Sequence, residues 1–494
     1  MGAFSLNTNI SSMNAQRINR ETNRDLTGSM EKLASGLRIT KAADDGSGET
    51  ISNSLRKQSS AIGQSIKNAN DAVAIIQIAD KAMDEQLKIL DTIKVKATQA
   101  AQNGQTKETR EAIQSDIQKL LNSLDDVAMN TSFNSQSLLS GSFTNKTFQV
   151  GGYSQQDITM TINSTLSTKV GSTRFETVTL VSGISDMTFN RVDGVNNIDL
   201  ESVTIGSLEV GTGVKALADV INKNSDNLKN IRAGWTNRAT ASVAVTTNAS
   251  IEGLKVNNIT IGNISGIGTN DNDGKLVNAI NEVKDLTGVE AYTDESGALN
   301  LRSLDGRGIR VSATSGLNSV GFANDTSLTD FGRLTLKRNG ATDINFSDAN
   351  NVTTTNPVAG TVMNLSDVNG ALTADQTSAI GGFANANEAN ANGLGIGVTT
   401  LAGAMAMMDI ADSAIMELDK IRSNIGSYQN SFISTINNIS VTKVNVDSAR
   451  SQLKDLDFAE ESAFFNKKQL LTQSGSYALS QANQIPANVQ KLLS

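Results

Sequence analysis

The side chains that could carry out chemistry in this chain are carboxylates, lysines and hydroxyls, because its 494 residues include no histidine and no cysteine. Their absence excludes thiol nucleophiles, disulfides and histidine general bases, and it removes the usual ligands of zinc, copper and iron. Paired carboxylates and Ser/Lys arrangements could still catalyse a reaction, but no motif for either is present. We therefore expect a structural protein with no enzymatic activity, no cofactor and no metal site.

One charged group near the N-terminus combines Arg38 with Asp44 and Asp45. It could form an ion pair between chains, or an aspartate could cap the N-terminus of the next helix. Of the two, we expect the cap. Other acidic residues at helical spacing are expected to form a solvated helix face: Asp71, Asp80, Asp84 and Glu85.

The composition also limits the possible partners. The net charge is −8 and no basic cluster is present, which argues against nucleic acid. No apolar run approaches the ~20 residues of a transmembrane helix, so we expect no membrane span. Residues 1–30 lack the apolar centre of a cleavable signal. An extracellular location would therefore require another export route.

The elements that must position these side chains are long helices, because two segments show the seven-residue repeat of a coiled coil. The columns of the first segment are Ile66, Val73, Asp80, Leu87, Lys94 and Ala69, Ile76, Met83, Leu90, Ala97. The second segment has one unbroken apolar column: Ala411, Leu418, Ile425, Phe432, Ile439, Val446 and Leu453. We expect the large apolar residues of these columns to form the seam between helices and to serve assembly. A helix over about 53–101, broken at Asn103-Gly104, would pair with the C-terminal helix in one bundle.

The middle of the chain, residues 140–400, has a different character. Period-two alternation, as in 158–162 and 334–337, predicts β-strands. Two similar units, at about 200–245 and 255–312, each read as a strand, a short helix and further strands. Residues 343–400 are poor in pattern, and Gly381-Gly382 and Gly393-Leu394-Gly395 resemble a return linker. The predicted fold class is α+β: a coiled-coil bundle built from both termini, with a β-rich central insertion that contains two small α+β modules.

Six motifs at the two ends, in order, resemble those of bacterial flagellin. They are Ser35-Gly36-Leu37-Arg38-Ile39, Ala42-Ala43-Asp44-Asp45, Asn68-Ala69-Asn70-Asp71, Ser448-Ala449-Arg450, Asp455-Leu456-Asp457-Phe458-Ala459 and Gln481-Ala482-Asn483-Gln484. The stretch 81–90 is similar to flagellins of Campylobacter-like bacteria. The middle repeats resemble the "IN" motif of some flagellins and hook-associated proteins.

The resemblance implies a domain arrangement. Residues 1–42 and 455–494 would form the inner coiled-coil core of a filament. Residues 43–175 and 400–454 would form a helical outer core with a β-hairpin. Residues 176–399 would form the variable, surface-exposed β-rich part.

The resemblance also implies partners and a location. The chain would polymerise with itself into the flagellar filament that drives swimming, outside the cell. Export would use a flagellar type III apparatus, with a cytosolic chaperone on the C-terminal helix. Filament cap and hook-associated proteins would be neighbours, and O-linked glycans are possible on the outer part.

In many flagellins the helix around residues 87–101 presents the surface read by the flagellin-sensing Toll-like receptor. Alignment on Leu90 and Gln99 places Thr92 where those chains have an arginine, Lys96 where they have a leucine, and Asp116 at their glutamate. Losing a bidentate donor and an apolar anchor should each cost about 1–3 kcal/mol at an interface hot spot. We therefore expect this chain to be poorly sensed.

Two other functions fit parts of the pattern. A hook–filament junction protein would share the terminal seams. A surface adhesin would act through the central modules, and its isolated 180–400 fragment would bind a ligand.

Overall fold

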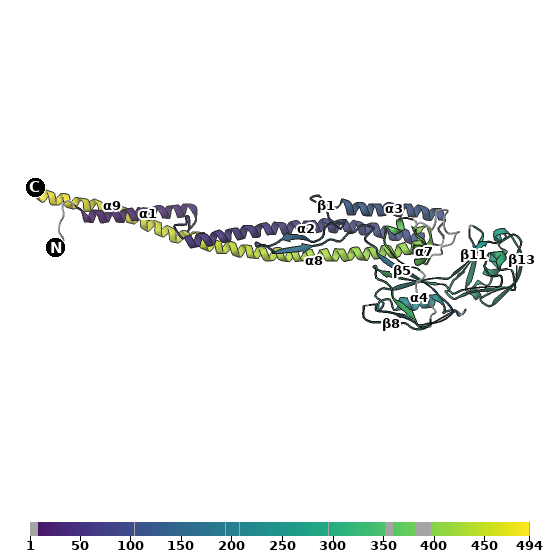
Figure 1. Ribbon diagram of the computed structural model, residues 1–494. Helices are drawn as coiled ribbons and strands as arrows, with labels where there is room; N and C mark the ends of the chain where they lie inside the picture. The colour runs from purple at the N-terminus through teal and green to yellow at the C-terminus, as the bar shows by residue number, and fades with distance from the viewer. Residues whose placement is uncertain are drawn as a thin grey trace. The chain divides into compact units, whose positions relative to one another are not determined.

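The computed structural model describes residues 8–102, 104–192, 194–206, 208–294, 296–350, 359–370, 372–381 and 397–493 (Figure 1). Its contacts divide the chain into two compact units. The first unit contains the described residues up to Ile76, the segment Asn145–Met160, and the described residues from Ser427 onward. The second unit contains Gln77–Thr144 and Thr161–Gly426.

Five long helices come from the two ends of the chain: α1 (Ile10–Ser35), α2 (Gly46–Ala100), α3 (Lys107–Asn130), α8 (Leu401–Lys454) and α9 (Phe458–Leu493). Helices α2 and α8 reach 55 and 54 residues because neither contains a proline and both keep a heptad repeat. Together with the β-rich insertion described below, these helices confirm the predicted fold class. Helix α2 begins earlier than predicted and ends just before the predicted break, whose Asn103 lies outside the described residues.

In the first unit, α1 lies antiparallel beside α9 (Figure 1). A hairpin of β3 (Lys146–Gln149) and β4 (Asp157–Met160) packs against the helices. Ser65 Oγ of α2 donates a hydrogen bond of 2.9 Å to the Gly151 carbonyl in its turn. Phe148 meets Phe432 of α8 edge-on, with 5.7 Å between ring centroids. The hairpin is therefore anchored on both α2 and α8.

The helical core of the second unit joins α3 to the parts of α2 and α8 that belong to this unit. Its fully buried side chains include Leu90 and Ile93 of α2 and Ile117, Leu121 and Leu124 of α3. From α8 it includes Met407, Ile410 and Leu418.

Part of residues 343–400, whose sequence is poor in pattern, also contributes to this core. Strand β20 (Ala359–Met363) joins a sheet, and helix α7 (Ala374–Ala379) follows it. Met363, Leu365 and Val398 are fully buried among the helices. The sequence does not reveal this strand and helix, because single apolar residues among Asn and Thr carry no period. Gly382 and Gly393-Leu394-Gly395 lie outside the described residues.

The β-rich insertion is built from antiparallel pairs. One four-stranded sheet contributes side chains to the helical core, among them Phe175 and Met363. Its strand order is β10 (Arg232–Thr236), β18 (Arg333–Asn339), β5 (Thr173–Thr179), β20. A second four-stranded sheet has the order β13 (Ile259–Ile267), β12 (Ala249–Val256), β16 (Ile309–Ser312), β17 (Ser327–Asp330). The smaller sheets are β1 (Ser132–Phe133) with β2 (Gln136–Ser137); β6 (Gly183–Ser185) with β9 (Val203–Ile205); β19 (Phe346–Asp348), β7 (Met187–Phe189), β8 (Ile198–Asp199); and β11 (Arg238–Ala244), β15 (Ala298–Ser303), β14 (Val289–Thr293). Short helices complete the insertion: α4 (Val214–Lys223), α5 (Lys275–Asn281) and α6 (Lys284–Thr287), with 3₁₀ turns η1 (Thr269–Asp271), η2 (Asn318–Val320), η3 (Asp367–Asn369) and η4 (Gly397–Thr399).

The two repeated units share the same anchor between helix and strand. At the end of α4, the Asn222 side chain donates to the Ala233 carbonyl at 2.8 Å and accepts from the Ala233 N–H at 2.9 Å. At the end of α5, Asn281 makes the same two bonds to Ala291, at 2.9 and 2.8 Å. Two separate hydrophobic cores lie in this part of the insertion. One includes Phe189 and Leu217 of α4, and the other includes Leu301 and Leu276 of α5.

Candidate assembly surfaces

The seam between α1 and α9 has heptad spacing but is filled mainly by small and polar side chains. Its residues are Ser12, Ala15, Asn19, Thr22, Leu26, Ser29, Leu33 on α1 and Glu461, Phe465, Lys468, Thr472, Gly475, Leu479, Ala482 on α9, all buried or half-buried. Small side chains allow the two backbones to approach closely, as the contacts between these helices show. This seam differs from the apolar one that the heptad argument predicts for such helices.

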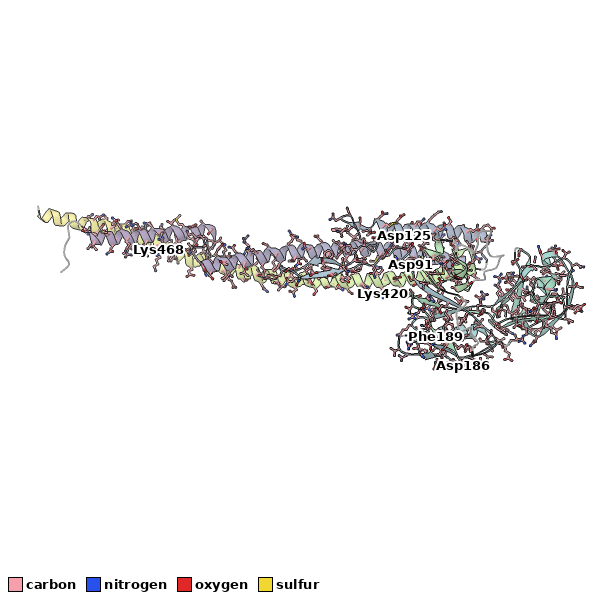
Figure 2. The ribbon with its side chains drawn as sticks, in the orientation of Figure 1. Asp91, Asp125, Asp186, Phe189, Lys420 and Lys468 are labelled. Carbon is pink, nitrogen blue, oxygen red and sulfur yellow. The ribbon has the colours of Figure 1, made fainter. Side chains whose placement is uncertain are left out.

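Hydrogen bonds and one ion pair cross this seam along its length. Lys468 Nζ lies 2.6 Å from Asp25 Oδ2, and Lys468 is labelled on α9 in Figure 2. Ser29 Oγ donates to Glu461 Oε1 at 2.5 Å. Near the other end, Ser12 Oγ donates to Asn483 Oδ1 at 2.7 Å. These bonds fix which α1 residue lies opposite which α9 residue.

Most of the large apolar side chains of α1 and α9 lie outside the seam, the exceptions being Leu26, Leu33, Phe465 and Leu479. Ile10 is 65% exposed and Leu470 is 64% exposed. Other exposed apolar residues on the two helices are Met13, Ile18, Met30, Phe458, Phe464, Leu471 and Tyr477. Phe464, Leu471 and Ala478, which follow one another at seven-residue spacing, are all exposed and share one face of α9. An elongated helix pair with apolar residues on its outside is suited to burial against other chains.

The turn after α1 and the end of α8 are held together by backbone and side-chain bonds. The Arg38 N–H donates to the Lys454 carbonyl at 2.8 Å, and the Leu456 N–H donates to the Gly36 carbonyl at 3.0 Å. The Arg38 guanidinium donates Nη2 to the Leu453 carbonyl at 2.6 Å. It thereby satisfies a carbonyl that the end of α8 leaves without a helical partner.

The aspartates beside Arg38 act within the chain. Asp45 Oδ1 accepts from the Gly48 N–H at 2.8 Å, so Asp45 caps the N-terminus of α2. Asp44 Oδ2 accepts from the Thr40 and Lys41 N–H groups, and these bonds contribute to a lowered pKa of its carboxyl. The capping interpretation is confirmed for Asp45.

On α2, the structure separates the two predicted columns. Ile76, Met83 and Leu90 are fully buried. The other column is only half-buried, at Ile66, Val73 and Leu87. Its place in the seam is taken by residues one position earlier: Ala72, Ala79, Gln86 and Ile93, all buried. Three of these four are small or polar, which hides them from a search for large apolar residues.

On α8, the predicted column is buried over its first part and half-buried over its last. Leu418, Ile425 and Phe432 are buried. Ile439, Val446 and Leu453 are half-buried. The second half of the column thus keeps apolar area open to solvent.

Two polar interruptions of the first predicted column form ion pairs with α8. Arg422 Nε lies 2.9 Å from Asp80 Oδ1, and its Nη1 lies 3.6 Å from Asp84. Lys94 Nζ lies 2.5 Å from Asp412 Oδ1. Asp80 and Asp84 therefore do not form the purely solvated face that the sequence suggested. They join α2 to α8 within the second unit.

The residues of the altered receptor surface lie on α2 and α3. Lys96 Nζ of α2 is 2.9 Å from Asp116 Oδ2 of α3, and this hydrogen bond lowers the pKa of Asp116. Thr92 is exposed, and its hydroxyl donates to the Lys88 carbonyl of its own helix at 2.8 Å. The structure thus brings Lys96 and Asp116 together and leaves Thr92 apart from them.

Within the described part of the chain, no helix is both long and apolar enough to cross a membrane. Over the same described residues, Asp and Glu side chains form no cluster of three or more that could hold a metal ion.

Comparison with protein families gives matches at both ends and in the centre. The model of the bacterial flagellin N-terminal helical region matches residues 6–144, and that of the C-terminal helical region matches residues 408–493. The flagellin hook IN motif matches residues 253–305, which cover most of the second of the two repeated units.

Curated relatives are similar over nearly the whole chain. Flagellin A of Helicobacter pylori is 52% identical over 99% of this chain and 100% of its own length. Flagellin A of Helicobacter mustelae is 50% identical over 95% of this chain and 100% of its own length. Among solved structures, FliC from Burkholderia pseudomallei aligns over 73% of this chain and 99% of its own, at 14% identity and a TM-score of 0.30, too low to support an argument. On the full-length identity and the matched terminal regions, the chain belongs to the bacterial flagellin family.

Proposed function

We propose that the paired terminal helices α1 and α9 drive polymerisation by burying their outward apolar side chains against neighbouring subunits. As a flagellin, the chain is a structural subunit of the extracellular filament that serves swimming. The observation that carries the proposal is the inverted arrangement of the helix pair, with polar residues in its seam and residues such as Leu470 outside. Burial of one such side chain contributes about 1.5–3 kcal/mol, so a row of them favours association strongly.

Heterologous contacts that do not close on themselves produce an open filament. In this arrangement residues 1–42 and 455–494 form the inner core, residues 43–175 and 400–454 the outer core, and residues 176–399 the outer surface. The two separate hydrophobic cores of the insertion support an outer part made of two modules.

Electron microscopy of seeded growth tests this proposal. Full-length protein is added to short filaments, beside a fragment that lacks residues 1–42 and 455–494. We expect the full chain to extend the seeds at uniform diameter and the fragment to remain monomeric. A full chain that only caps the seeds would instead favour a hook–filament junction protein.

We also propose that the altered surface on α2 and α3 weakens recognition by the flagellin-sensing Toll-like receptor. The support is the ion pair between Lys96 and Asp116, which engages both charges within the chain. A receptor would have to break that pair to contact Asp116, and Thr92 offers no bidentate donor.

A receptor reporter assay can test this second proposal. The combined change Thr92→Arg and Lys96→Leu should raise the response at least about tenfold, since two hot-spot contacts are restored. The matched control is Lys81→Leu, which makes a similar change at an exposed position on the same helix. An unmodified chain that already signals as strongly as an arginine-bearing flagellin would rule the proposal out.

The exposed apolar surface of α9 also suggests a partner for the subunit before export. We propose that a chaperone covers the apolar face of α9 before type III export, because Phe464 and Leu471 would otherwise be open to solvent. Changing Leu470 and Leu471 to serine should weaken capture of the chaperone, whereas Lys467→Ser on the same helix should not.

We further propose that Ser and Thr hydroxyls of the outer modules accept O-linked glycans, which intact-mass measurement of native filaments would reveal.

A further inference from the structure

We propose that the polar residues between α1 and α9, and above all the Asp25–Lys468 ion pair, act as a register key for the two ends of the chain. A single register determines which apolar residues stand side by side on the outside of the pair. The key therefore sets the pattern that each subunit presents to its neighbours. This inference rests on the proposed role of the two helices in polymerisation.

The first argument is the chemical nature of the seam. Large apolar residues such as Leu can slide by a heptad and find an equivalent partner, so an apolar seam discriminates weakly between registers. A buried polar residue cannot slide without losing its partner, which is how single polar residues specify register in coiled coils. In this seam Ser12, Ser29 and Lys468 each meet a partner of complementary chemistry.

The second argument is the position of the ion pair. Lys468 is 19% exposed and Asp25 is 39% exposed, so the pair is shielded on the Lys468 side more than a typical surface pair. The ammonium also lies 4.9 Å from the centroid of the Phe464 ring, which adds a cation–π contact. A shift by one heptad would place Asp25 opposite Gly475 or Glu461, neither of which can replace a lysine.

The third argument is that the contacts between the two helices agree on one antiparallel register. Asn19 lies beside Gly475, and a Cβ atom added to Gly475 would meet the Asn19 side chain at ordinary van der Waals distance. A Cβ atom built on Gly475 would lie 3.8 Å from the Cβ of Asn19. That distance matches the mean of ~3.8 Å between the Cβ atoms of a disulfide. Because the chain has no cysteine, an introduced pair would report this register without competing thiols.

The experiment compares two cysteine pairs in the full-length chain. The reporter pair is Asn19→Cys with Gly475→Cys, and the shifted pair is Asn19→Cys with Ala482→Cys, one heptad further along α9. Each protein is oxidised as soluble subunit and after growth on seeds, and closure within one chain is read from mobility on a denaturing gel. We expect the reporter pair to close at least about tenfold faster than the shifted pair.

Charge variants then test the key itself. Asp25→Lys should abolish the preference for the reporter pair, and adding Lys468→Asp should restore it by exchanging the two charges. Lys467→Asp makes the same charge change at the neighbouring, exposed position and should leave the preference intact. In seeded growth, Asp25→Lys should raise the critical concentration at least about tenfold, with recovery in the double variant.

Three results would overturn the inference. The preference could survive Asp25→Lys, the double variant could fail to restore it, or the disulfides could join different chains. Failure of the unmodified chain to extend seeds would instead count against the proposed function. The cross-link in the soluble subunit would still report the register in that case.

Discussion

Gln86 and Gln114 are both buried among the helices of the second unit, yet their amide groups are used differently. Gln86 Nε2 donates to the Leu124 carbonyl at 3.1 Å, while its Oε1 accepts no hydrogen bond from the described residues. Gln114 uses both ends, because Nε2 donates to the Val368 carbonyl and Oε1 accepts from the Val398 N–H. The second glutamine is a structural connector between α3 and the return segment, and the first is a half-satisfied polar group in an apolar seam.

Replacing these glutamines by methionine, which has a similar volume, should have opposite effects. Gln86→Met should raise the free energy of unfolding by about 1 kcal/mol, because it removes a buried oxygen without a partner. Gln114→Met should lower it by about 1–3 kcal/mol, since two backbone groups lose their partner. Urea unfolding followed by circular dichroism measures both. Equal effects of the two variants would show that the hydrogen bonds do not decide the outcome.

Glu176 supplies a pH prediction at the residue scale. Burial raises the pKa of this carboxyl, although Arg174 Nε, 2.9 Å from Oε1, and the Ile344 N–H act to lower it. Asp343, which also contacts Arg174, acts in the same direction as burial. A raised pKa in the folded state means that the contribution to stability is complete below the ordinary Glu pKa. It is lost as pH rises through the folded value.

Glu176→Gln should therefore gain stability relative to the unmodified chain as pH rises across that window. The single tryptophan, Trp235, reports on this sheet, because its strand pairs with β18 and β18 pairs with β5. Urea midpoints from its fluorescence between about pH 4 and 8 give the difference. Glu49→Gln is the control of opposite sign, since the hydrogen bond from Lys454 lowers the pKa of Glu49. Hydrogen exchange should show that α2 of the Glu49→Gln variant loses protection, relative to the unmodified chain, as pH rises.

Among the elements, the two repeated modules give a paired prediction. Asn222→Ala and Asn281→Ala each remove two hydrogen bonds between a short helix and the next strand. Each change should cost about 1–2 kcal/mol and should loosen only its own module, because the modules have separate hydrophobic cores. Hydrogen exchange resolved by peptide measures this. Loosening of both modules by either change would mean that they unfold as one.

Sequence periodicity predicts an element well when its buried residues are large and its period is unbroken. The α2 column with Ile76, Met83 and Leu90, the strands β9, β14 and β18, and the buried part of the α8 column meet this condition. The second column of α2 does not, because alanine and glutamine occupy it. The seam of α1 and α9 is not predicted from the sequence for the same reason, since serine, threonine and asparagine at heptad spacing resemble a solvated face. The pairing of Arg422 with Asp80 depends on the packing of two distant segments, which no local pattern encodes.

For the molecule as a whole, the apolar outside of the α1–α9 pair predicts how polymerisation responds to solvent. Burial of apolar area is favoured by warming near room temperature and by salts excluded from protein surfaces, such as sulfate. We expect sulfate to lower the critical concentration of seeded growth more than chloride at equal ionic strength. The double change Leu470→Ser and Leu471→Ser should raise the critical concentration by at least about tenfold. Sedimentation of polymer at a series of concentrations measures both effects, and an equal response to the two salts would point to charge screening instead.

The antiparallel pairing of α1 with α9 makes the order of synthesis matter. Among the described helices, α1 is made before the others, and α9, against which it packs, is made after them. A shortened chain that ends before Phe458 would carry α1 without that helix and so would present half of the paired surface. A truncated chain would therefore not be incorporated into the polymer, because it lacks half of the surface that contacts the neighbouring subunits. Incorporation itself thus selects for full-length chains.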